Sequence, residues 1–177
     1  MLTQAPVLET PRLRLRQLTL DDYDALVTCW ASPDTVRYIG SGQPQDSEMS
    51  WGRLLRYIGH WQLLGYGYWA VCEKESGRLI GTMGIQDQKR NLTPILEYPE
   101  AGWTLSPAAC GQGFATEALT AILAWSDKTL AGPLCCIIDD DNQPSIRLAE
   151  RIGFQFRHYV EYHNKTVRML VRPLPSQ

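Results

Sequence analysis

The stretch Glu100-Ala101-Gly102-Trp103-Thr104-Leu105 is followed, after a short spacer, by Cys110-Gly111-Gln112-Gly113-Phe114-Ala115-Thr116. The first run predicts a strand, and the apolar spacing after the second predicts a helix. Two glycines in the turn between them let the backbone approach a ligand closely. Free N–H groups at the start of such a helix, with the positive end of its dipole behind them, favour an anion such as a pyrophosphate. The same turn could instead bind nothing, because the Walker pattern is missing and Thr116 stands where GxGxxG needs its third glycine.

Strand and helix signals extend outward from this stretch in both directions. The predicted strands are residues 12–18, 68–72, 79–85, 97–105, 134–138, 154–162 and 165–171. The predicted helices are residues 20–31, 47–64, 115–130 and 144–152. In the second helix we expect the apolar stripe to comprise Trp51, Leu54, Leu55 and Ile58.

The order of these elements predicts an α/β (α+β) fold with a central mixed sheet of six to seven strands and helices on both faces. The strand–helix–strand unit over residues 97–138 is expected to be a right-handed parallel crossover. The hairpins on either side are antiparallel, so most of the sheet should be antiparallel. With 177 residues and no linker or repeat, the chain is expected to form a single domain over residues 1–177.

Composition and charge exclude several classes of function. The chain has 44% hydrophobic and 20% charged residues, which is typical of a globular protein with a full core. Its 17 Lys and Arg against 19 Asp and Glu give a formal net charge of −2, so we expect no nucleic-acid partner. No stretch has the length of a membrane span, and the first residues lack a signal-peptide pattern. We therefore expect a cytoplasmic protein with no membrane partner.

The cysteines and histidines do not form a recognisable metal site. The five cysteines are an odd number without CxxC spacing, which favours reduced thiols over disulfides or zinc. The three histidines share no ligand spacing. We expect no metal in the function.

Four stretches together resemble the GNAT N-acetyltransferase superfamily, particularly its RimJ/RimL-like branch, which modifies ribosomal-protein N-termini. They are residues 9–16 with 21–22 and 32–38, residues 80–85, residues 100–105 with 111–118, and residues 142–154. They keep the family's order and span nearly the whole chain. The resemblance implies a GNAT-like fold whose sheet splays after the fourth strand, an acyltransferase activity, and acetyl-CoA (coenzyme A) as cofactor.

The resemblance also implies roles for individual residues. Backbone N–H groups would bind the pyrophosphate of coenzyme A from Gly111, Gln112, Gly113, Phe114, Ala115 and Thr116. The edge of Trp103, Thr104 and Leu105 would hydrogen-bond the pantetheine arm like an added strand. Asn142 and Ser145 would lie near the same arm, although both could simply form the cap and first turn of a helix.

This chain departs from the family's pattern at two positions. Cys110 stands where the family often has Gln or Arg, so the loop would bind phosphate through its backbone. Ala149 stands where many members carry a tyrosine thought to protonate the leaving thiolate. Either another group does so or none is needed, since a thiol with a pKa of about 8.5 is a fair leaving group. Tyr159 and Tyr162 lie on the next predicted strand, where packing is the simpler interpretation of both.

The reaction implied by the resemblance is direct attack of a primary amine on the acetyl thioester, through a tetrahedral intermediate. Glu100 is the candidate to take the amine's proton, directly or through water. It could instead be a solvated strand residue paired with an Arg. A backbone N–H near Leu105 would polarise the carbonyl.

The acceptor could be a protein N-terminus or a small-molecule amine, and the near-neutral charge does not choose between them. A monomer and a homodimer both remain open. A second hypothesis is a non-catalytic acyl-CoA-binding or sensing module, which the missing tyrosine at Ala149 keeps open. Thiol release from acetyl-CoA over a panel of amines separates the two hypotheses.

Overall fold

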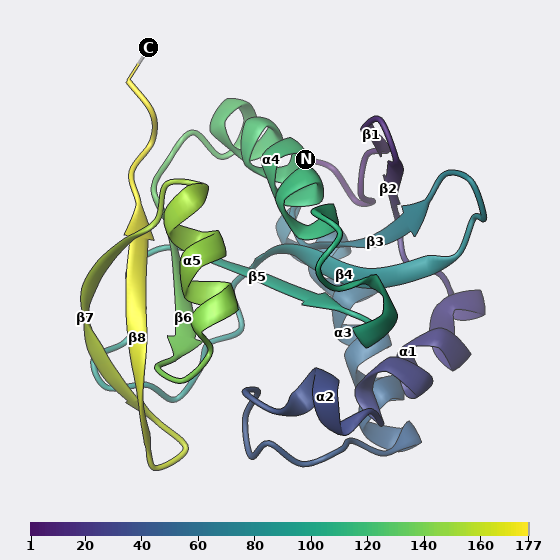
Figure 1. Cartoon of the computed structure of the whole chain (residues 1–177). Coiled ribbons are helices and arrows are strands. Elements are labelled where there is room, and N and C mark those ends of the chain that lie inside the picture. Colours follow the sequence, from purple (N-terminus) through teal and green to yellow (C-terminus); the bar gives the residue numbers. More distant parts are fainter. Residues whose placement is uncertain (177) are drawn as a thin grey trace.

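One eight-stranded sheet runs through the structure, a computed structural model that describes residues 1–176 (Figure 1). Its strands are β1 (Leu8–Glu9), β2 (Leu13–Arg16), β3 (Tyr68–Glu73), β4 (Leu79–Gln86), β5 (Glu100–Leu105), β6 (Leu134–Asp139), β7 (Gln155–Tyr162) and β8 (Lys165–Arg172). They lie in the order β1-β2-β3-β4-β5-β6-β8-β7, and only the β5–β6 pair is parallel. The mixed, mostly antiparallel sheet is confirmed. The prediction of six to seven strands is wrong by one, because the two-residue β1 is too short to leave a periodic pattern.

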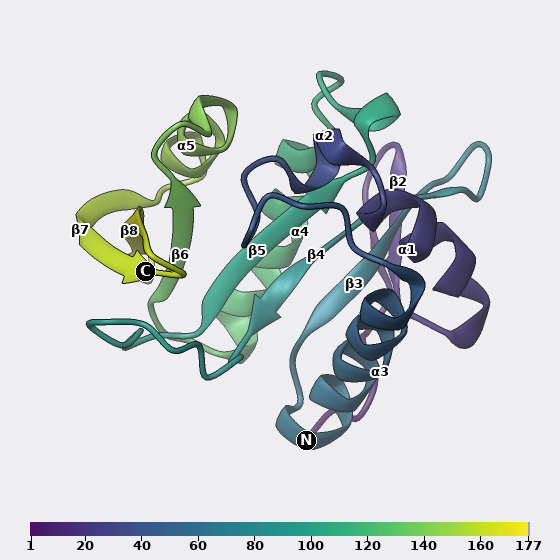
Figure 2. The ribbon, with the colours of Figure 1, turned by 90° about the horizontal axis from the view of Figure 1, so that it is seen from below.

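Helices cover both faces of this sheet, as expected (Figure 2). They are α1 (Tyr23–Trp30), α2 (Pro33–Val36), α3 (Ser47–Leu64), α4 (Phe114–Thr129) and α5 (Gln143–Arg151), with 3-10 turns at Leu20–Asp22 and Pro107–Ala109. Buried residues of α1 and α3 pack on one face of β3, and those of α4 pack on the other face of the sheet. The sequence did not predict α2, since a single helical turn has no repeat to detect.

The buried face of α3 differs from the expected stripe. Trp51 and Leu55 of the expected stripe are 42% and 46% exposed, so they lie outside the buried face. The buried positions are Ser50, Leu54, Tyr57 and Trp61, which recur at helical spacing of three and four residues. Because Tyr and Trp fit a buried or an exposed face, the sequence pattern did not distinguish the two stripes.

Strands β5 and β6 pair at only one position, Glu100 with Cys135. From there β5 continues along β4, and β6 continues along β8. Figure 2 shows the two ribbons separating toward their C-terminal ends. The splay after the strand that the sequence placed at 97–105 is therefore confirmed, and most of this edge of β5 has no neighbouring strand.

Trp61 fixes the start of β3 from the helix above it. Its Nε1–H donates to the carbonyl oxygen of Tyr68 at 2.8 Å. Its ring also packs edge-on against Trp69 and Trp125, with centroids 4.8 and 5.7 Å away. This contact joins α3, β3 and α4 in one core.

We predict that Trp61→Phe lowers the free energy of unfolding by about 1–3 kcal/mol, because it leaves a buried carbonyl without its donor. Chemical denaturation measures the change. Trp51→Phe, on the exposed side of the same helix, should stay within about 0.5 kcal/mol of the wild type. Equal stability of the Trp61 variant and the wild type would contradict this role.

Candidate active site

The two faces of β5 present different groups, because side chains alternate along a strand. The α4 face carries Ala101, Trp103 and Leu105, which belong to or pack against the core around α4. The opposite face carries Glu100, Gly102 and Thr104, with Gly102 against Tyr68 of the α1–α3 core. The strand therefore separates two layers that could each receive a different ligand.

The glycine turn after β5 is shaped to leave the start of α4 uncapped. Gly113 is the N-cap and has a φ of +79°, a left-handed value that other residues rarely adopt. Within residues 1–176, no side chain caps the first turn of this 16-residue helix. The N–H groups of that turn therefore remain available, and the helix dipole favours an anion there.

Arg12 and Glu117 hold this turn against the start of β2. Arg12 donates from Nε to Glu117 Oε1 at 2.8 Å and from Nη1 to the carbonyl of Gln112 at 2.9 Å. Thr10 donates its hydroxyl to the other oxygen of Glu117 at 2.6 Å. Burial alone would raise the pKa of Glu117, but these donors outweigh it and lower the pKa. The carboxylate thus stays charged and fixes the turn.

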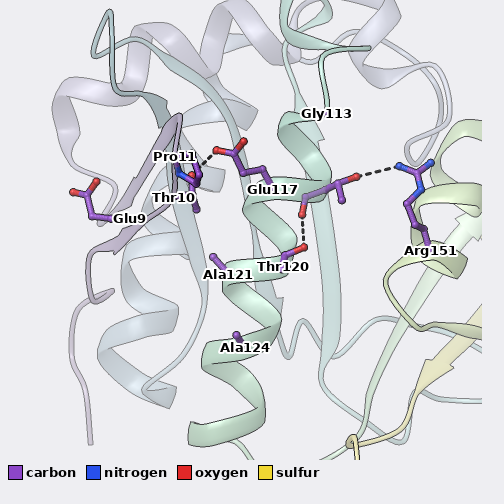
Figure 3. A pocket seen from close by; sticks show the side chains of 10 residues that line it. Glu9, Thr10, Pro11, Gly113, Glu117, Thr120, Ala121, Ala124 and Arg151 are labelled. Carbon is purple, nitrogen blue, oxygen red and sulfur yellow. Dashed lines mark hydrogen bonds between the residues drawn. The ribbon is translucent and has the colours of Figure 1, made fainter.

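An open groove begins at this turn and continues along α4 (Figure 3). Its volume is about 640 Å³, and its walls are residues 9–11, the outer side of α4 and Arg151. Arg151 donates to Thr116 Oγ1 at 3.2 Å. No carboxylate in residues 1–176 forms an ion pair with Arg151, so the groove has a free cation near the uncapped helix end.

We predict that Arg12→Gln weakens the binding of coenzyme A, the cofactor that the resemblance implies, about tenfold, or about 1.4 kcal/mol, because the turn loses the tether at Gln112. Isothermal calorimetry measures the affinity. Arg14→Gln is the matched control, since Arg14 pairs with Glu9 at 3.8 Å and does not contact the turn. Wild-type affinity in a folded Arg12 variant would show that the turn holds its shape without this arginine.

Three predicted site residues meet across the splay between β5 and α5. Trp103 Nε1–H donates to Ser145 Oγ at 3.3 Å. Asn142 caps α5, with its Oδ1 accepting from the Ser145 N–H at 3.3 Å. The capping role considered for Asn142 is thus observed, and its contact with a cofactor stays a prediction.

Glu100 is paired with an arginine, as one interpretation of the sequence held, but it is buried and not solvated. Its side chain lies at the paired end of β5 and is only 5% exposed. Arg90 Nε donates to Glu100 Oε2 at 2.7 Å, and Arg90 Nη1 donates to the hydroxyl of Tyr162 at 2.7 Å. Burial would lower the pKa of Arg90, but the charge of Glu100 outweighs it and raises the pKa. The guanidinium of Arg90 therefore stays charged beside Glu100.

A cavity of about 310 Å³ opens beside this pair. It is lined by Glu100, Arg90 and the connection between β4 and β5, over residues 86–90, 95–96 and 98. Oε1 of Glu100 forms no hydrogen bond within residues 1–176, so it is free to accept a proton or a hydrogen bond. Tyr162 does more than pack in the core, because its hydroxyl accepts a hydrogen bond from Arg90. Tyr159 is exposed.

Sequence reasoning missed Arg90, Tyr162 and the Arg12–Glu117 pair as parts of the site. Arg90 lies in a connection without periodicity, and nothing in its spacing points to Glu100. Glu117 looked like a first-turn acid of α4, which is a common helix feature. Only the folded chain brings these charges together.

Other sequence expectations concern groups that do not join the site. Ala149 is fully buried and has no proton to give. His60 contacts the carbonyl of Tyr66 and accepts from the Asp87 N–H, which is a structural role. Residues 1–176 contain no cluster of three or more potential metal ligands. In the same range, no helix has the length and apolar character to cross a membrane.

Comparisons with known proteins agree on one family. A family model described as acetyltransferase (GNAT) domain matches residues 12–155. The uncharacterized N-acetyltransferase YoaA of Bacillus subtilis is 28% identical over 166 residues, which cover 91% of either chain. The acetyltransferase of Agrobacterium tumefaciens is 30% identical, with a TM-score of 0.80 over 94% of each chain. RimL, a ribosomal L7/L12 α-N-protein acetyltransferase solved with coenzyme A, is 17% identical and similar in fold, with a TM-score of 0.78 over 96% of this chain and 98% of that one.

Proposed function

The chain belongs to the GNAT acetyltransferase family, and from this premise we propose that it transfers an acetyl group from acetyl-CoA to a primary amine at β5. The observation that carries this proposal is the parting of β5 from β6 beyond Glu100, next to the uncapped start of α4. An unpaired strand edge offers hydrogen bonds to an extended amide chain, and an uncapped helix end offers them to phosphate. These are the two polar parts of coenzyme A.

The residues of this region fit such a cofactor. The backbone of Gly111, Gln112, Gly113, Phe114, Ala115 and Thr116 would bind the pyrophosphate, with Arg12 holding the turn in place. The edge formed by Trp103, Thr104 and Leu105 would hold the pantetheine arm. Asn142 and Ser145 would contact the same arm from α5. Once bound, acetyl-CoA would supply the thioester carbonyl as the electrophile.

On the other face of β5, Glu100 is proposed to accept a proton from the attacking amine. The ion pair with Arg90 holds the carboxylate in place beside the cavity, and its second oxygen has no hydrogen-bond partner within residues 1–176. A backbone N–H near Leu105 would stabilise the negative charge that develops on the carbonyl oxygen. The acceptor, whether a protein N-terminus or a small amine, would approach from this side.

We predict that Gly113→Glu weakens coenzyme A at least tenfold, about 1.4 kcal/mol, because a carboxylate would stand where the pyrophosphate binds. Calorimetry measures binding, and thiol release over a panel of amines measures transfer. Gly132→Glu, in a surface connection with open surroundings, is the control. A wild-type protein that binds coenzyme A yet releases no thiol with any amine would favour an acyl-CoA sensor.

We predict that Glu100→Gln lowers kcat by about 10²–10⁴, with coenzyme A affinity unchanged. The defect should shrink as the pH rises toward the pKa of the amine, since a neutral amine needs less help from a base. Steady-state rates across pH test this.

Glu100→Gln also leaves the buried Arg90 unpaired, which should lower the free energy of unfolding by about 3–5 kcal/mol. Arg90→Gln separates this effect from catalysis, because it breaks the same ion pair but keeps the carboxylate of Glu100. We expect it to retain more activity than Glu100→Gln, because the carboxylate that accepts the proton is still present. Equal loss in both variants, independent of pH, would remove Glu100 from the chemistry.

A further inference from the structure

The hydroxyl of Tyr68 lies directly against the backbone of β5 at Gly102. A Cβ atom built on Gly102 would lie 1.8 Å from Tyr68 Oη, so glycine is required for the hydroxyl to occupy this place. The side chain of Tyr68, on β3, is 6% exposed. It lies over the face of β5 that also carries Glu100. Gly102 and Glu100 are two residues apart, which along a strand is about 7 Å.

This hydroxyl has no hydrogen-bond partner in the part of the chain that the structure describes. Tyr57 accepts from Arg53, and Tyr162 accepts from Arg90, but no hydrogen bond within residues 1–176 engages the hydroxyl of Tyr68. The fully buried side-chain atoms without a partner in residues 1–176 are Trp30 Nε1, Ser50 Oγ, Arg53 Nε and Ser126 Oγ. Tyr68 Oη is not one of them, so a ligand at β5 that accepts a hydrogen bond can reach it.

The side chain is also held rigidly. Its ring stacks on Tyr57 with centroids 4.6 Å apart and planes 17° apart, and its carbonyl accepts from Trp61. Burial, followed by the nearby Tyr57 and Glu100, raises the pKa of Tyr68 well above its usual value. The hydroxyl therefore keeps its proton and is held at a fixed place, which is the condition for a preorganised donor.

That place lies on the unpaired part of β5, beyond the Glu100–Cys135 pair. Glu100 and Tyr68 thus stand along one face of the strand, the first as a proton acceptor and the second as a donor. Ala149, at the position of the expected tyrosine, supplies no donor.

We propose that Tyr68 is a catalytic residue whose hydroxyl donates a hydrogen bond to the thioester sulfur as the carbon–sulfur bond breaks. This inference rests on the proposed acetyl transfer. The amine nitrogen forms the new carbon–nitrogen bond, and one of its protons passes to Glu100. The electron pair of the broken bond goes to sulfur, which leaves as a thiolate bound by the hydroxyl and takes its proton from solvent. Tyr68 remains protonated throughout.

Tyr68→Phe tests the proposal, with Tyr57→Phe as its control, because Tyr57 belongs to the same ring stack but its hydroxyl faces Arg53. We expect Tyr68→Phe to lower kcat at least tenfold with unchanged affinity for coenzyme A. Ultraviolet titration of the thiol in the enzyme–coenzyme A complex should show ionisation at a higher pH in Tyr68→Phe than in the wild type. Tyr57→Phe should change neither.

Wild-type values of both quantities in Tyr68→Phe would overturn the proposal and leave acetyl transfer intact. If the wild type transfers acetyl to no amine, the proposed function fails, and the thiol titration still shows whether the hydroxyl faces the sulfur.

Gly102→Ala gives an independent test of the same contact. Its Cβ should displace the hydroxyl, lowering both the rate and the melting temperature. In a Tyr68→Phe background the nearest ring atom would be 3.1 Å from that Cβ, so the same substitution should lower the melting temperature less. Additive losses in the double variant would show that the hydroxyl does not occupy this place.

Discussion

The single backbone pairing between β5 and β6, at Glu100 and Cys135, is the constraint on which the rest of the site depends. A strand inside a sheet normally has both edges hydrogen-bonded, and an unpaired edge is a ready template for another extended chain. Here the edge is internal, because α5, β6 and β8 continue on the far side of the split. The opening is therefore protected from pairing with other proteins while its backbone groups stay available. The glycine turn and the uncapped α4 lie at the end of this same edge, so one strand positions both polar regions.

The two faces of β5 make different contacts. Trp103 faces α4 and reaches Ser145 across the split, whereas Glu100 and Gly102 face the core beneath α1 and α3. A buried carboxylate is tolerated there because Arg90 neutralises it, and Arg90 is in turn held by Tyr162 on β7. The ion pair thus links both halves of the sheet at the point where they still touch. Breaking it should disturb the site as well as stability, which is why the pair is better probed from both partners than from one.

The sequence predicted the order of the elements, the parallel crossover and the glycine turn, because each leaves a local signal in periodicity or turn chemistry. It failed at β1 and α2, which are too short to show a period, and at the buried face of α3, where aromatic residues fit either stripe. Within the site, Glu100 and the Trp103 edge follow from a resemblance that the family match confirms. Arg90 and Tyr68 could not be predicted, since their meeting with β5 depends on the path of a long irregular connection and on a glycine that makes room for a hydroxyl.

Amide hydrogen exchange with and without coenzyme A tests most directly whether the open edge of β5 is a binding surface. The account predicts slower exchange on binding at Trp103, at Leu105 and in residues 111–116, because N–H groups on the open edge of β5 and in the turn gain acceptors. The far strands β1 and β2 should exchange as before. Protection confined to other segments, or binding without any protection along β5, would contradict the account.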